Sequence, residues 1–110
     1  MMPKALGAAS VRPFILSLLA RQDTYGYQMM QYAESLSDGS LDLQAGILYP
    51  ILRRLENDKL IESYWVNPKG ERKRRYYRLT KKGKEALEIE KREWLKMYDT
   101  FMGLWEPAHV

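Results

Sequence analysis

The feature that most constrains the fold of this chain is a β-hairpin pattern in its second half. Residues 60–66 are rich in β-branched and aromatic side chains, which favour strands, and residues 72–79 are predicted to be the returning strand. The turn from Asn67 to Gly70 reads Asn-Pro-Lys-Gly, in which proline presets one backbone angle and glycine tolerates unusual ones. We therefore predict a two-stranded hairpin here, which excludes a purely helical fold.

The positive charge of the chain is concentrated on this hairpin. The run from Lys69 to Lys84 holds nine Lys or Arg and one acid, whereas the whole 110-residue chain has a net charge of only +4. Clustered positive charge attracts a polyanion and gives nucleic-acid binding its salt dependence. Tyr76 and Tyr77 inside the run favour a folded strand over a disordered tail. From charge alone, a DNA-binding surface and a solvated basic loop are equally good interpretations.

Helical patterns precede the hairpin. Apolar residues at helical spacing predict three helices, over residues 10–21, 25–37 and 44–58. Pro13 fits only the first turn of the first helix, because proline lacks the amide hydrogen needed farther along. Thr24 is expected to cap the second helix.

Three short helices, a hairpin with a basic tip and a long last helix form the order of a winged helix-turn-helix. In such a module the third helix enters the major groove, and the hairpin, or wing, contacts phosphates or the minor groove. We therefore expect an α+β, mainly α fold in which residues 1–79 bind DNA and include the wing, residues 60–79. Thr80 is expected to cap the last helix, residues 80–105, which would serve dimerisation, and residues 106–110 are expected to fray.

The composition excludes several classes of function. The chain has no cysteine, which rules out disulfides and thiol chemistry and fits a reducing cytoplasm. Its one histidine, His109, stands next to the C-terminus, so we expect no histidine-dependent catalytic or metal site. No apolar run reaches the length of a membrane span, and the start lacks a signal-peptide core. We therefore expect a cytoplasmic protein that is not an enzyme, needs no metal or cofactor and has no membrane partner.

Four ordered motifs carry a family resemblance: Tyr25-Gly26-Tyr27, Leu48-Tyr49-Pro50 with Leu52, Arg54, Leu55 and Glu56, Leu60-Ile61, and the run from Arg74 to Thr80 followed by Gly83. On these motifs the chain resembles the PadR family of bacterial transcriptional regulators over roughly residues 11–105. The resemblance implies a winged-helix repressor that dimerises through its terminal helices and is released from its operator by a small effector. Its single C-terminal helix resembles a compact subgroup, some of whose members sense flat aromatic or multidrug-type compounds.

The third helix supplies one group of expected DNA contacts. Gln44 can reach a base edge or a phosphate, and the hydroxyl of Tyr49 can reach a phosphate. The small residues Ala45 and Gly46 allow a phosphate to approach the helix N-terminus closely. Arg53 lies four residues beyond Tyr49 on the same face and is expected to share that role. The alternative is that Gly46 is only a loose helix start and Tyr49 only a packing residue.

The wing supplies the second group. Alternation along the returning strand puts Tyr77 and Leu79 on the core side, packed against Ile61 or Trp65, and leaves Arg78 as mainly solvated charge. The expected DNA contacts outside the third helix are Tyr25 from the second helix and Lys69, Arg72, Lys73 and Arg74 near the wing tip.

The last helix carries an apolar stripe at coiled-coil-like spacing. We expect it to form a dimer interface with the first helix, although packing within one chain is the alternative. The residues expected at the interface are Phe14, Leu18, Leu87, Trp94, Leu95, Tyr98, Phe101, Met102 and Trp105. Trp94 stands where the compact subgroup of the family carries an interface tryptophan, so it is a candidate to stack on a planar aromatic effector, with Trp105 as a weaker one.

The leading hypothesis is a homodimeric, sequence-specific repressor on a pseudo-palindromic operator in double-stranded DNA. The alternative is a winged-helix protein–protein interaction module without sequence-specific DNA binding. The intact basic wing favours the first.

Overall fold

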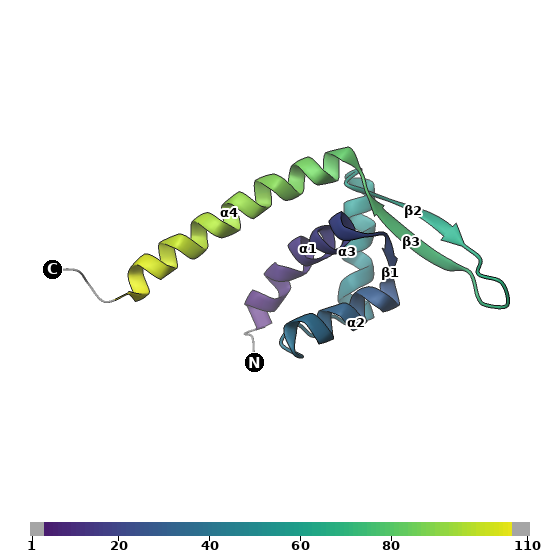
Figure 1. Ribbon diagram of the computed structural model, residues 1–110, viewed down its shortest axis with the longest axis horizontal. Coiled ribbons are helices and arrows are strands. Elements are labelled where there is room, and N and C mark those ends of the chain that lie inside the picture. Colours follow the sequence, from purple (N-terminus) through teal and green to yellow (C-terminus); the bar gives the residue numbers. More distant parts are fainter. Residues whose placement is uncertain (1–3, 107–110) are drawn as a thin grey trace.

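The computed structural model describes residues 4–106, with the side chains of residues 4–8 left aside. The chain is mainly helical and contains one small sheet (Figure 1). In chain order the elements are α1 (Lys4–Arg21), β1 (Thr24–Tyr25), α2 (Gly26–Ser37), α3 (Ala45–Asn57), β2 (Ile61–Val66), β3 (Arg74–Leu79) and α4 (Lys81–Trp105).

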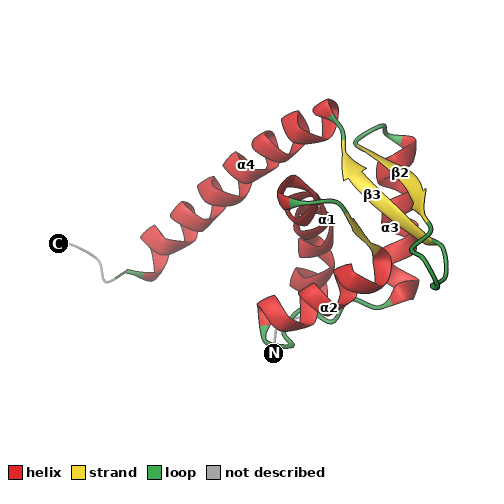
Figure 2. Ribbon diagram, turned by 45° about the vertical axis from the view of Figure 1, so that its right-hand side comes forward, coloured by secondary structure: helices red, strands yellow, loops and turns green. Residues whose placement is uncertain are grey.

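The core lies among α1, α2, α3 and the inner face of the sheet. Residues at helical spacing on each helix point inward, which is why the periodic pattern of the sequence was informative. Figure 2 shows α1, α2 and α3 gathered beside the strands, whereas α4 runs away from them. The largest fully buried side chains are Ile15, Leu16, Met29, Leu48, Leu52, Leu55, Ile61 and Thr24.

The sheet is antiparallel with strand order β1-β3-β2, and Ile61 pairs with Leu79 across it. Tyr77 and Leu79 are buried, which confirms the expected inner face of β3. Trp65, the alternative packing partner, lies opposite Arg75 and is 63% exposed. The hairpin extends beyond the cover of the helices, so its outer residues have no core to enter.

Two local predictions were wrong. The first helix begins at Lys4, so Pro13 lies inside it rather than in its first turn. A proline there costs about 3 kcal/mol, and the burial of neighbouring apolar residues such as Ile15 offsets that cost. Thr24 does not cap α2, because it pairs with Tyr77 in the sheet and its hydroxyl donates to the side chain of Gln28.

The first turns of α4 are fixed to the body. The hydroxyl of Thr80 accepts a hydrogen bond from the amide of Gly83 at 3.0 Å, as expected for the helix cap. A methyl group on Gly83 would overlap the carbonyl oxygen of Leu60, so only glycine permits this close approach. An ion pair of 3.0 Å between Arg12 and Glu90 ties α4 to α1.

Beyond Glu90 the helix leaves the body, and every residue from 91 to 101 is exposed (Figure 1). The molecule is therefore elongated, with extents of 66 × 30 × 21 Å. Glu106 ends the helix, and the remaining residues of the expected frayed tail, including His109, lie outside the described residues. Across residues 4–106, no helix combines the length and apolar character that a membrane crossing needs.

Candidate nucleic-acid interface

The N-terminus of α3 is open to solvent. Gln44, Ala45 and Gly46 are all exposed, and Gln44 occupies the cap position without bonding the helix through its side chain. Its amide group instead donates to the carboxylate of Asp42 at 3.1 Å. Amides in the first turn are thus left without a side-chain cap, and such amides, together with the helix dipole, favour a phosphate.

Tyr49 lies at the junction of α2 and α3. A methyl group on Gly26 would overlap the hydroxyl of Tyr49, so the glycine makes room for this ring. Any larger residue at position 26 would therefore displace the Tyr49 ring. Tyr49 packs here and is also 41% exposed, so packing does not exclude the phosphate contact expected of its hydroxyl.

A polar contact fixes the wing against α3. The carboxylate of Glu56 accepts hydrogen bonds from Ser63 at 2.6 Å and from the guanidinium of Arg75 at 3.0 and 3.1 Å. Arg53, one turn earlier on α3, is exposed and has no ion pair within residues 4–106. Burial raises the pKa of Tyr77 at this junction, while the charge of Arg75 lowers it. The third helix and the wing therefore form one surface.

The wing tip carries unpaired cations. Lys69, Arg72 and Lys73 are exposed and have no ion pair in the part of the chain that the structure describes. Arg74 differs, because its guanidinium pairs with Glu71 at 3.4 Å and lies 4.8 Å from the centre of the Tyr25 ring. Tyr25 thus supports Arg74, a role that the sequence pattern did not show.

The outer face of the sheet is a row of aromatic rings across all three strands. The ring of Tyr76 lies 5.2 Å from that of Tyr25 and 5.8 Å from that of Tyr64. The hydroxyl of Tyr64 donates to the carboxylate of Asp23, which raises the pKa of Tyr64. Arg78, expected as solvated charge, stacks over Tyr64 and pairs with Glu62 at 2.9 Å. The side chain of Arg78 is still 51% exposed, and what sequence reasoning missed is its pair of partners on the neighbouring strand.

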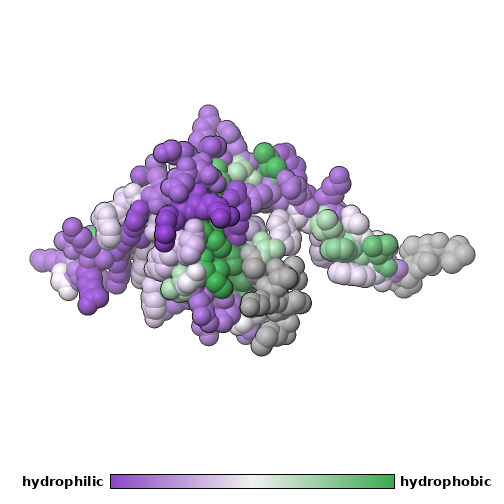
Figure 3. Space-filling model, turned by 180° about the vertical axis from the view of Figure 1, so that it is seen from behind, coloured by the Kyte–Doolittle hydropathy of each residue, from purple (hydrophilic) through white to green (hydrophobic). Residues whose placement is uncertain are grey.

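The apolar stripe on α4 divides into two parts. Leu18 and Leu87, both expected at a dimer interface, are buried in the core of this chain and offer little surface to a partner. Trp94 is 41% exposed, and Trp105 is 70% exposed and stacks on Phe101. Figure 3 shows hydrophobic side chains gathered on the outer part of α4, near the C-terminal end.

Trp94 forms one wall of a shallow, mainly apolar groove between α1, the end of α2 and α4. The groove has a volume of about 380 Å³. Its other lining residues are Ser10, Pro13, Phe14, Ser17, Leu36, Ser37 and Leu41. Trp105 does not line it, so the structure does not bring the two tryptophans of one chain together.

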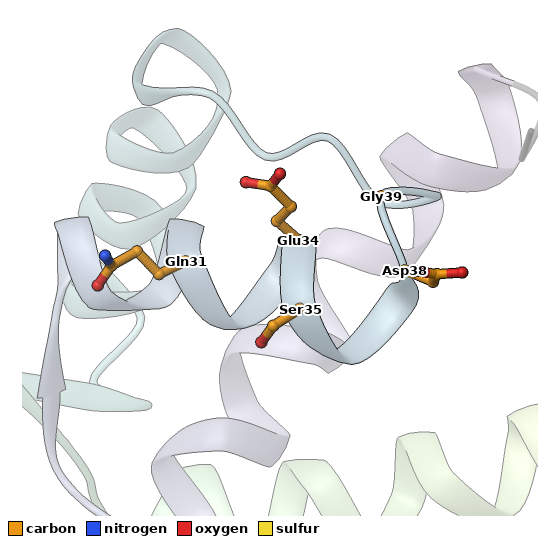
Figure 4. Close-up of a pocket in the computed structure, with 5 residues that line it drawn as sticks. All are labelled: Gln31, Glu34, Ser35, Asp38 and Gly39. Carbon is orange, nitrogen blue, oxygen red and sulfur yellow. The ribbon is translucent and has the colours of Figure 1, made fainter.

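A second, polar depression lies on the exposed side of α2 and has a volume of about 490 Å³. Figure 4 shows that the side chains of Gln31, Glu34, Ser35 and Asp38 point in different directions. They form no convergent site, and none of the expected DNA contacts lines this depression.

The order of elements, the open N-terminus of the third helix and the basic hairpin together define a winged-helix protein of the DNA-binding class. Residues 15–89 match the transcriptional regulator PadR-like family. The chain belongs to this family, whose members are transcriptional regulators rather than enzymes.

Solved structures agree with this assignment. A transcriptional regulator from Clostridium thermocellum has a TM-score of 0.86 and 25% identity, covering 96% of this chain and 100% of its own. A PadR family transcription regulator from Clostridium difficile R20291 has a TM-score of 0.76 and 33% identity, covering 87% and 98%. The chain is also 31% identical over 93 residues to the transcriptional regulator YqjI of Escherichia coli K12. That match covers 84% of this chain but only 42% of YqjI.

Proposed function

We propose that this regulator is a cytoplasmic homodimer that binds a pseudo-palindromic operator and acts as a repressor released by a planar aromatic effector. The observation that carries the DNA-binding surface is the wing, whose tip holds three unpaired cations and whose returning strand is tied to α3 by the ion pair of Arg75 with Glu56. Because these contacts hold α3 beside the wing, a duplex that receives α3 in its major groove also meets the cations of the tip.

The test compares two triple variants that each lose three positive charges. One neutralises Lys69, Arg72 and Lys73 at the wing tip, and the other neutralises three exposed lysines of α4, which are Lys81, Lys84 and Lys96. The wing variant should bind all duplexes more weakly and lose roughly one unit of salt slope for each lost phosphate contact. The α4 variant should keep most of the wild-type slope. Equal slopes for the two variants would contradict the wing assignment.

Sequence preference should depend on the third helix. Replacing Gln44 by alanine should change the ranking of operator sequences, because its amide can bond a base edge, while the salt slope stays near that of the wild type. A protein–protein interaction module without DNA binding, the alternative function, would show no salt-dependent shift of a random duplex in the first place.

The dimer gives the operator its symmetry. Two third helices related by a two-fold axis should lie roughly 34–36 Å apart, so that they enter successive major grooves on one side of the duplex. Footprinting should show two protected half-sites, and protection of one half-site would count against this arrangement.

The effector part rests on Trp94, whose ring walls the apolar groove beside Phe14. A planar cationic dye should quench its fluorescence by stacking, and Trp94→Ala should remove both the binding and the release from DNA. Trp105 is the weaker candidate, and Trp105→Ala separates its quenching from that of Trp94. The dye can release the protein from DNA only if it binds one dimer geometry more tightly than the other, because equal affinity for both leaves their equilibrium unchanged. If dyes bind the Trp94→Ala protein with the same affinity as the wild type, the effector proposal is wrong and Trp94 serves only as an anchor of the proposed dimer.

A further inference from the structure

Trp65 is an exposed aromatic side chain on the α3 side of the wing. Alternate residues of a strand share a face, so Trp65 lies on the same face of β2 as Ile61 and Ser63. Ile61 is buried in the core, and Ser63 reaches Glu56 of α3. Trp65 is the next residue outward on this face, between α3 and the wing tip.

The indole has no partner of its own in the described chain. Its cross-strand neighbour, Arg75, has its guanidinium turned to Glu56, and no ring contact or side-chain hydrogen bond joins the indole to any residue from 4 to 106. By contrast, the tyrosines on the opposite face of the sheet, such as Tyr64 and Tyr76, contact one another. On the inner face Tyr77 is buried in the core, whereas Trp65, farther out on the same face, is left exposed.

The position limits what Trp65 can meet. On one side of it stands α3 with Arg53 exposed, and on the other stand the unpaired cations of the tip, such as Lys73. A duplex that contacts both must run its sugar–phosphate backbone past the indole. The side chain suits that backbone, because its flat apolar face can cover a deoxyribose and its single polar group is a donor, as an anionic phosphate requires.

We propose that Trp65 is a DNA-backbone contact, with its ring against a deoxyribose and its Nε1–H donating to a phosphate oxygen. The inference rests on the proposed DNA-binding function and adds a residue that sequence patterning had considered only as an alternative packing partner of Tyr77 and Leu79. An indole is uncharged, so it displaces no counterion, and a phosphate carries no base identity. Trp65 therefore contributes affinity without changing the salt slope or the sequence preference, unlike Lys73 and Gln44.

The experiment measures binding to a mixed-sequence duplex at two or more salt concentrations. Trp65→Ala should weaken binding about tenfold, the usual size of one lost hydrogen bond to a charged group, with an unchanged salt slope. Trp65→Phe keeps a ring but has no N–H, so its affinity for the duplex should lie between those of the wild type and Trp65→Ala. The matched control is Val66→Ala, which truncates the neighbouring residue on the opposite face and should bind like the wild type.

A second readout uses intrinsic fluorescence. The duplex should change the emission of the wild type, and that change should be smaller in Trp65→Phe, which retains Trp94 and Trp105. If the wild type binds the duplex but Trp65→Ala and Trp65→Phe bind equally well with the same emission change, this inference is overturned and the proposed function stands. If the wild type does not bind duplex DNA at all, the proposed function itself fails. Thermal unfolding of both variants confirms that weaker binding is not lost folding.

Discussion

The β2–β3 hairpin and the outer half of α4, residues 91–105, both project from the body, but their surfaces are opposite in character (Figure 1). On the hairpin the tyrosines contact each other and the exposed residues near the tip are mainly charged. On α4 the exposed residues include Leu95, Tyr98 and Phe101, with no core to cover them.

The difference shows which projection is complete in a single chain. The hairpin is packed within one chain and needs no partner to fold, and its unpaired cations can bind a polyanion. The outer half of α4 leaves large apolar side chains in water at a cost of roughly 25 cal/mol for each Å². A second copy of the same stripe would cover them, and this is the reason for proposing a dimer interface here.

The largest expected effect is on the α4 side. Phe101→Asp puts a charge into the proposed interface twice, once from each chain, and should weaken dimerisation by about 4 kcal/mol, or roughly a thousandfold. Analytical ultracentrifugation at micromolar concentration measures the change. Asp99→Asn, an exposed residue two positions earlier, is the control and should stay dimeric. A Phe101→Asp protein that sediments like the wild type would contradict the comparison, because it would show that the apolar stripe of α4 is not covered by a second chain.

The boundary between the anchored and the free part of α4 can be located with two glycines. Gly83→Ala should destabilise the protein by about 3 kcal/mol, because the added methyl group meets the carbonyl oxygen of Leu60. Gly103→Ala meets nothing within 4 Å and should instead favour the helix by about 0.5–1 kcal/mol. Denaturant unfolding measures both. Similar effects at the two sites would mean that α4 is held equally along its length.

On the hairpin side, Tyr76→Ala removes the central ring of the aromatic row. Losing its contacts with Tyr25 and Tyr64 should cost about 2 kcal/mol of unfolding free energy. Tyr27→Ala is the control, since Tyr27 is exposed and makes no ring contact within the described residues. Equal stability of the two variants in thermal unfolding would show that the hairpin is not held by its own aromatic residues.

The smallest expected effect is a dependence on pH. Burial raises the pKa of Tyr77 above its ordinary value of 10.0, so the folded protein holds this proton more tightly than the unfolded chain. The stabilisation is complete below pH 10 and is lost as the pH rises through the folded pKa. Tyr77→Phe should show a shallower decline of unfolding free energy above pH 10 than the wild type does. An identical decline would assign the effect to other groups.

Much of the hairpin and of α4 could be predicted because the decisive signals are local. The turn from Asn67 to Gly70 and the alternation of the flanking strands act within a few residues. The cap formed by Thr80 is likewise a contact between near neighbours and was predicted correctly. The fold class followed from the order of such elements.

The parts that sequence could not predict depend on long-range contacts. The two-residue strand β1 exists because Thr24 pairs with Tyr77, more than fifty positions later. The stripe on α4 gave no indication of where the body stops covering it, so Leu87 was assigned to an interface although it lies in the core. The partner of Arg78 was missed for a similar reason, since Glu62 lies on the adjacent strand.

The contacts that hold the first turns of α4, from Gly83 to Glu90, have a mechanical consequence. From Glu90 to Trp105 the helix is about 22 Å long at its usual rise per residue. A bend of about 5° beyond Glu90 therefore moves the far end by about 2 Å. The free part of the helix acts as a lever, and in the proposed dimer a change of its angle would alter the separation of the two third helices.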